Sequence, residues 1–164
     1  MSKILIANWK MNLTVGEGLK YIKALKKSKQ EAVIAAPFTF LSALKTVADS
    51  RKIKLAGQNV SQFSEGAFTG EISAKMLKES GCAYCLVGHS ERRIYFQETD
   101  TQINQKIKNL LNNPAILFIN IICFLSLCPV TINKNFCVLD LLRSAADNNK
   151  RGNFRLYTCR LCIY

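Results

Sequence analysis

The sequence is poor in the residues that mark several unusual protein classes. Its 164 residues include three Pro and eight Gly, too few for a collagen-like fibre, and 49% are hydrophobic, too many for a disordered chain. The length suits one domain with a hydrophobic core, and seven Cys in such a chain do not indicate a small disulfide scaffold. Only four apolar residues, 4–7, precede Asn8, so we expect no signal peptide and a cytoplasmic protein with reduced thiols.

The composition changes near residue 114. The last fifty residues contain no Glu and a single Gly, Gly152, yet they hold five of the seven Cys. The two parts do not follow one pattern, so we expect two segments, residues 1–113 and residues 114–164.

Residues 1–113 alternate between short apolar runs and amphipathic stretches. Helix-capping pairs, such as Thr14 with Glu17 and Thr99 with Gln102, precede apolar residues at helical spacing. Strand followed by helix, repeated four times, predicts an α/β fold with a parallel sheet joined by right-handed crossovers. The four predicted buried strands are 3–9, 31–36, 52–56 and 82–87, and the predicted helices begin near 14, 41, 73 and 99.

Polar clusters follow three of the predicted strands, at residues 8–10, 57–59 and 88–93. In parallel sheets and barrels the chemistry lies at the carboxyl ends of the strands. The pattern therefore indicates an α/β enzyme with one His and one Lys at the mouth of a sheet, but it does not name a substrate.

Three motifs occur in order on successive strand–helix units: Asn8-Trp-Lys-Met-Asn12, Gly66-Ala-Phe-Thr-Gly-Glu71 and Gly88-His-Ser-Glu-Arg-Arg93. Together, over about residues 1–113, they resemble the triosephosphate isomerase family. The resemblance implies an incomplete TIM (β/α)8 barrel, with about four of its eight units, in a homodimer that needs no cofactor and no metal. It also implies interconversion of dihydroxyacetone phosphate and D-glyceraldehyde 3-phosphate in glycolysis and gluconeogenesis.

The resemblance also implies roles for individual residues. His89 matches the electrophile that polarises the substrate carbonyl, which in this family is a neutral imidazole at a helix N-terminus, and the backbone amides of residues 90–93 would supply that field. Lys10 matches the cation that holds the anionic substrate, with Asn8 beside it as a polar contact. Thr69 lies near the tip of the loop that reaches into the partner subunit.

Structural explanations remain open for the same residues. A single His after a strand is commonly a hydrogen-bonded loop residue, and Lys10 alone would be an ordinary surface lysine. For Glu91 and Arg92 we favour an ion pair that braces the loop over a catalytic role.

The chain departs from the family after Asn113. A full barrel takes about 250 residues, and the family's base is a glutamate on the sixth strand. No Glu follows residue 113 here, and the later acids, Asp140 and Asp147, have no matching context. A general base contributes about 10²–10⁴-fold in rate, so we expect a truncated isomerase with no catalytic base and very low activity.

Residues 115–128 are strongly apolar and end at Pro129. The start of this run could form a fifth strand, with irregular structure following to the end of the chain. The run is short for a membrane span, which needs about 20 residues, so a tail-anchored membrane protein is a lesser alternative. A stronger alternative is a non-catalytic fragment, in which strands one and four have unpaired edges and the chain self-associates or complements a missing half.

Two further classes find little support. The pairs Cys82/Cys85 and Cys159/Cys162 are too far apart for a zinc ribbon, and residues three apart on a strand face opposite sides, so we expect the strand cysteines to fill the core. The net charge of +12 raises nucleic-acid binding, but its main cluster, Lys20 to Lys29, suits a solvated helix face, so no nucleic-acid partner is expected.

Overall fold

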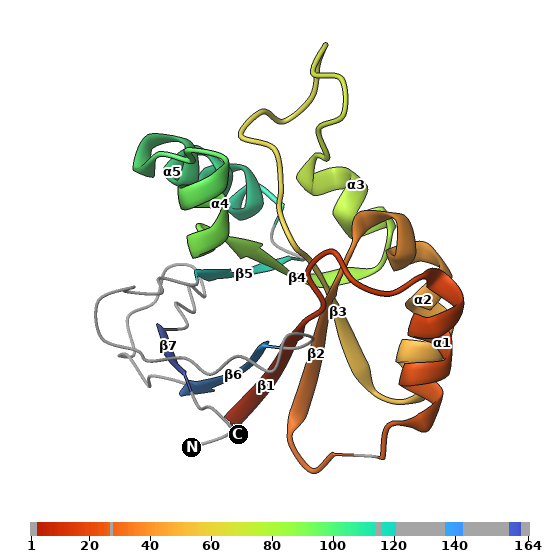
Figure 1. Cartoon of the computed structure of the whole chain (residues 1–164). Coiled ribbons are helices and arrows are strands. Elements are labelled where there is room, and N and C mark those ends of the chain that lie inside the picture. Colours follow the sequence, from red (N-terminus) through yellow and green to blue (C-terminus); the bar gives the residue numbers. More distant parts are fainter. Residues whose placement is uncertain (1–2, 27, 114–115, 121–136, 143–157, 162–164) are drawn as a thin grey trace.

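The computed structural model describes residues 3–26, 28–113, 116–120, 137–142 and 158–161 (Figure 1). The elements follow in this order: β1 Lys3–Asn8, α1 Val15–Ala24, β2 Glu31–Ala36, α2 Phe38–Ser50, β3 Ile53–Gly57, α3 Ala74–Glu79, β4 Cys82–Val87, α4 Ser90–Tyr95, α5 Asp100–Leu111, β5 Leu117–Asn120, β6 Cys137–Leu142 and β7 Thr158–Leu161.

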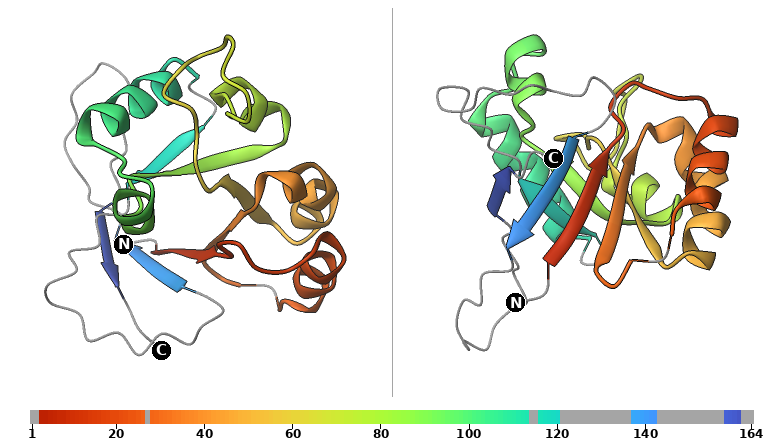
Figure 2. Two further views of the ribbon diagram at one scale, coloured as in Figure 1. Left: turned by 45° about the horizontal axis from the view of Figure 1, so that its top comes forward. Right: turned by 60° about the horizontal axis from the view of Figure 1, so that its bottom comes forward.

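The parallel α/β architecture predicted from the sequence is confirmed. Strands β1 to β5 pair with their successive neighbours, all in parallel, and belong to one seven-stranded sheet of order β5-β4-β3-β2-β1-β6-β7. The sheet curves so that the main helices lie on its outer side (Figure 2). The carboxyl ends of β1 to β4 consequently meet at one mouth.

Local signals account for most of the helix starts. Thr14 and Thr99 each form the predicted capping box, and Ser73 accepts a hydrogen bond from the Met76 amide at the start of α3. Helix α2 begins directly after Pro37, earlier than its apolar spacing indicated. The sequence did not predict α4 as a separate helix; it has six residues and begins after His89, its N-cap.

The main core lies between the parallel sheet and the helices on its outer side. Ile34 and Val87 of the strands belong to one buried cluster with Ile22 of α1 and Leu44 of α2. Trp9, directly after β1, is fully buried in this cluster. The parallel strands are therefore anchored to the helices just below the mouth.

The described residues of the C-terminal segment correct two expectations. The expectation that strands one and four leave open edges is wrong, because β4 pairs with β5 in parallel and β1 pairs with β6 antiparallel. The start of the apolar run forms the expected fifth strand, β5. The expectation of irregular structure from there to the end of the chain is wrong for β6 and β7, which are strands that pair with each other antiparallel.

The described helices include none that is both long and apolar enough to cross a membrane. Most of the apolar run at 115–128, on which the membrane alternative depends, lies outside the described residues.

Gly18 and Gly16 provide a matched test of the packing between α1 and β1. A Cβ on Gly18 would lie 2.9 Å from Cζ3 of the buried Trp9 ring, whereas a Cβ on Gly16 would have no neighbour within 4 Å. Alanine is otherwise favoured over glycine in a helix by about 0.5–1 kcal/mol. We expect Gly16→Ala to raise the free energy of unfolding in urea and Gly18→Ala to lower it by about 1–3 kcal/mol. Equal effects of the two substitutions would contradict this packing.

Candidate active site

The loops after β1 and β4 meet at the mouth of the sheet. Lys10 Nζ lies 2.6 Å from Glu91 Oε1, a contact that joins residues 81 positions apart in the sequence. His89, the N-cap of α4, directly precedes the turn that carries Glu91, and its Nδ1 lies 3.6 Å from Glu91 Oε2. The structure therefore brings an ammonium, a carboxylate and an imidazole together where a parallel sheet places its chemistry.

Lys10 is held in an unusual backbone conformation. Its φ is +52°, in the left-handed region that non-glycine residues seldom adopt. The Lys10 amide donates to Asn8 Oδ1 at 3.0 Å, and Gln58 Nε2 donates to the carbonyls of Lys10 and Ala35, each at 2.9 Å. Asn8 is thus a contact of the Lys10 backbone, and Gln58 connects this loop to β2.

Sequence reasoning did not single out Gln58. The signal for it was its place in the polar cluster that follows β3, but only the fold shows that its amide joins the loop after β1 to strand β2.

His89 is largely buried and positioned for a neutral state. Its Nδ1 accepts a hydrogen bond from the Glu91 amide at 3.2 Å, so the proton of the neutral ring is on Nε2. Burial lowers the pKa of His89 below its ordinary value; the Glu91 carboxylate opposes this shift and the Lys10 ammonium adds to it. A neutral imidazole with Nε2–H can donate to an oxygen of a bound molecule.

The expected ion pair between Glu91 and Arg92 is wrong. Neighbouring residues at the start of α4 point in different directions, so Glu91 pairs with Lys10 while Arg92 Nε contacts Glu98 Oε2 at 2.7 Å. Glu98, with a side chain only 3% exposed, also pairs with Lys106 through Oε1 at 2.8 Å. This charge cluster connects α4 to α5 through Glu98.

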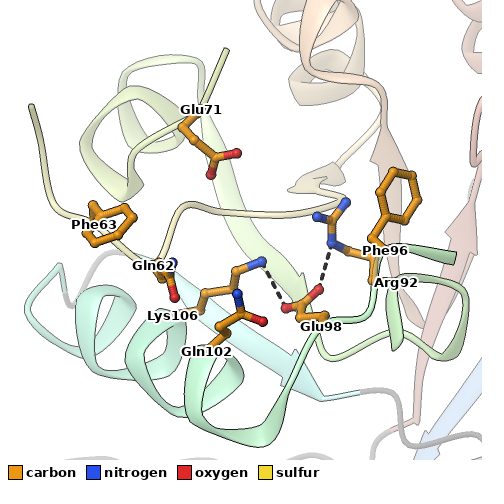
Figure 3. A pocket seen from close by; sticks show the side chains of 8 residues that line it. All are labelled: Gln62, Phe63, Glu71, Arg92, Phe96, Glu98, Gln102 and Lys106. Carbon is orange, nitrogen blue, oxygen red and sulfur yellow. Dashed lines mark hydrogen bonds and ion pairs between the residues drawn. The ribbon is translucent and has the colours of Figure 1, made fainter. Parts of the chain in front are cut away.

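A pocket of about 230 Å³ adjoins this charge cluster (Figure 3). Lys106 Nζ also contacts Asn59 Oδ1 at 2.8 Å, so all three ionised groups of the cluster are engaged within the protein. The pocket is lined by Gln62, Phe63, Glu71, Arg92, Phe96, Glu98, Gln102 and Lys106. Nothing in the sequence pattern marked Glu98 or Lys106, because their pairing depends on how α5 packs.

Thr69 is exposed on the long loop between β3 and α3. In Figure 1 this loop projects from the mouth side of the molecule, well beyond the helices. Phe63 and Phe68 stack within it at 3.8 Å between ring centroids. Thr69 is therefore exposed to solvent on a projecting loop.

The strand cysteines are core residues, as predicted. Cys82 and Cys85 are both buried and unpaired by disulfides, and burial raises the pKa of Cys82 to about 12 and that of Cys85 further. Within the described ranges, no three His, Cys, Asp or Glu side chains come close enough to hold a metal ion. Cys162 and the side chain of Cys159 lie outside what the structure describes.

A protein-family model described as triosephosphate isomerase matches residues 3–125. The chain belongs to the triosephosphate isomerase family. It is 51% identical over 112 residues to triosephosphate isomerase of Alkaliphilus metalliredigens, covering 66% of this chain and 45% of that protein. It is 46% identical over 115 residues to the isomerase of Picosynechococcus, covering 66% of this chain and 48% of that protein.

The fold comparison agrees with this family. A crystal structure of triosephosphate isomerase from Bartonella henselae matches with a TM-score of 0.69 and 35% identity, over 74% of this chain and 51% of that one. The chain spans about half the length of these relatives.

The electrostatic balance at His89 gives a direct test, because this is the only His in the sequence and its NMR signals are unambiguous. We expect Lys10→Met to raise the pKa of His89, since it removes a neighbouring positive charge, and Glu91→Gln to lower it further. The pH titration of the imidazole Cε1–H signal measures both changes. Lys20→Met, on the exposed face of α1, is the matched control and should leave the titration unchanged; the opposite signs would refute the geometry.

Proposed function

We propose that this chain carries the electrophilic and anion-binding part of a triosephosphate isomerase site. The substrates would be dihydroxyacetone phosphate and D-glyceraldehyde 3-phosphate, interconverted through an enediol in glycolysis and gluconeogenesis, in the cytoplasm. Residues 1–113 would form the isomerase-like part and residues 114–164 a divergent segment, whose β5 still continues the parallel sheet. The meeting of Lys10, Glu91 and His89 at the mouth of the sheet supports this proposal most directly.

His89 would act as the electrophile. The Nε2–H of its neutral ring would donate to the substrate carbonyl oxygen and stabilise the charge that forms there when the neighbouring carbon loses a proton. The same ring could pass a proton between the two oxygens of the enediol. The hydrogen bond from the Glu91 amide to Nδ1 supports this role, because it fixes the tautomer.

Lys10 would bind the anionic substrate and the negative charge of the enediolate. The Lys10 side chain is 28% exposed, so an anion can approach its ammonium group. When no anion is bound, the Glu91 carboxylate compensates the positive charge. Asn8 would support this role by holding the Lys10 backbone in its left-handed conformation.

The proton-abstracting base is the part that the chain does not supply in this proposal. Asp140 and Asp147 are the only acids after residue 113. We propose that turnover is consequently slow, below that of a complete site by at least about 10²–10⁴-fold, the usual contribution of a positioned base.

The test is conversion of D-glyceraldehyde 3-phosphate by the purified protein, followed with a coupled assay. We expect a weak rate above the buffer reaction that His89→Gln removes and Lys10→Ala reduces at least about tenfold, because each substitution deletes a group that stabilises developing negative charge. Lys20→Ala, which removes an equal charge from α1, is the matched control. A rate unaffected by His89→Gln and Lys10→Ala would refute the proposed site. A rate equal to the buffer reaction would refute the proposed activity and leave only membership of the family.

We further propose a homodimer in which the loop carrying Thr69 reaches the partner subunit. Large exposed apolar side chains on the segments that follow β1, β3 and β4 support this, because exposed apolar surface can mark an association site. Tyr95 is 74% exposed and Met11 96% exposed. Others are Phe63 and Phe68 on the loop between β3 and α3, and Ile94 and Phe96 at α4.

Sedimentation velocity tests the dimer. We expect a species of twice the 18.4 kDa chain mass that Tyr95→Asp shifts toward the monomer, since a buried unpaired charge disfavours an interface. Leu111→Asp, at the far end of α5, is the control and should leave the mass unchanged. A parent protein that stays monomeric at high concentration would exclude the dimer.

A further inference from the structure

Strand β1, which leads to the candidate site, has a neighbour on each edge. Strand β2 pairs with one edge in parallel, and β6 pairs with the other antiparallel, in a register that runs from Asn8 opposite Cys137 to Lys3 opposite Leu142. The family match ends at residue 125, so β6 comes from the part of the chain that the family relation does not cover.

The backbone directions of β1 show which amides face each neighbour. The Trp9 amide donates to the Ala35 carbonyl of β2 at 2.9 Å. Because amides two apart along a strand point the same way, those of Leu5 and Ala7 also face β2. The amides at 4, 6 and 8 therefore face β6, and they would be open to water if β6 were absent.

The inner side of the sheet is buried although the main helices lie outside it. Ile34 and Val87 face the helices, whereas the residues that alternate with them face inward. Ile6, Val33 and Leu86 on this inner side are each 1% exposed or less. A sheet that is open on its inner side would leave such residues in water.

The curvature of the sheet explains this burial. Strand β7 pairs with β6, and β7 and β5, the two ends of the strand order, come within 8 Å between Cα atoms. Figure 2 shows β6 and β7 continuing the sheet beyond β1 on the side without helices. The strands thus come round toward a ring that encloses the inner apolar side chains.

We propose that β6, by occupying the free edge of β1 within the same molecule, closes that edge to pairing with any other chain, and that β6 and β7 together bring the sheet round toward β5. An edge that is already paired does not offer its amides and carbonyls to another chain. The edge of β1 is thus closed to a second copy and to a complementary half, and the strand that carries Asn8 is fixed on both sides.

Residue-resolved hydrogen exchange on the full chain tests this pairing. We expect the amides at 4, 6 and 8, which face β6, to be protected to within about tenfold of those at 5 and 7, which face β2. The second set is an internal control within the same strand. Exchange at 4, 6 and 8 at least about 100-fold faster than at 5 and 7 would overturn the proposal, as would rapid exchange at all five.

An engineered cross-link tests the register and whether β6 belongs to the same molecule. Ala7 and Val138 are opposite each other, at a separation that suits a disulfide, so we expect Ala7→Cys with Val138→Cys to form one within a single chain under mild oxidation. The control pair, Ala7→Cys with Leu139→Cys, is offset by one residue and faces opposite sides of the sheet. Peptide mapping separates these links from those of the native cysteines.

Equal yields for the two pairs, or no link in either, would overturn the register. A covalent dimer from the matched pair would show that the strand comes from a second copy and would overturn the intramolecular assignment. Neither readout depends on isomerase activity, so failure of the proposed function and failure of this pairing are distinguishable.

Discussion

Parallel pairing of β1 to β4 is the constraint on which the candidate site depends. It aligns the carboxyl ends of strands separated by about eighty residues of sequence, and only then can Lys10 and Glu91 form a 2.6 Å contact. A change in the register of one strand would exchange its two faces and separate these side chains. The helices that bury the outer side of the sheet therefore also maintain the geometry at its mouth.

Burial then determines the charge state of the site. Removing His89 from water disfavours its protonated form more than the nearby Glu91 favours it, and the Glu91 amide occupies Nδ1. Glu91 thus acts on His89 in two opposite ways: its carboxylate favours the protonated imidazole, and its backbone amide favours the neutral one. The pairing of that carboxylate with Lys10 limits the first effect.

Sequence patterns were sufficient where the determining interactions are local. The capping boxes at Thr14 and Thr99 and the apolar runs of the strands depend on residues within a few positions, and these elements are as predicted. The motif around His89 indicated the family, but not the partner of Glu91, because Lys10 approaches it from another strand. Glu98 could not be identified for the same reason, since both its partners depend on the packing of α4 against α5. Local sequence patterns could not predict the pairing of β6 with β1, because the sequence of a strand does not specify which strand edge it pairs with.

Trp9 links the core to the mouth of the sheet. It stands between Asn8 and Lys10 in the sequence, while its ring is buried against Gly18 and meets Tyr21 edge-on, with 5.7 Å between centroids. It is also the only Trp in the chain. The tryptophan fluorescence of the protein therefore originates from a single indole at the junction of β1 and α1, and its emission wavelength reports whether that junction is closed to solvent.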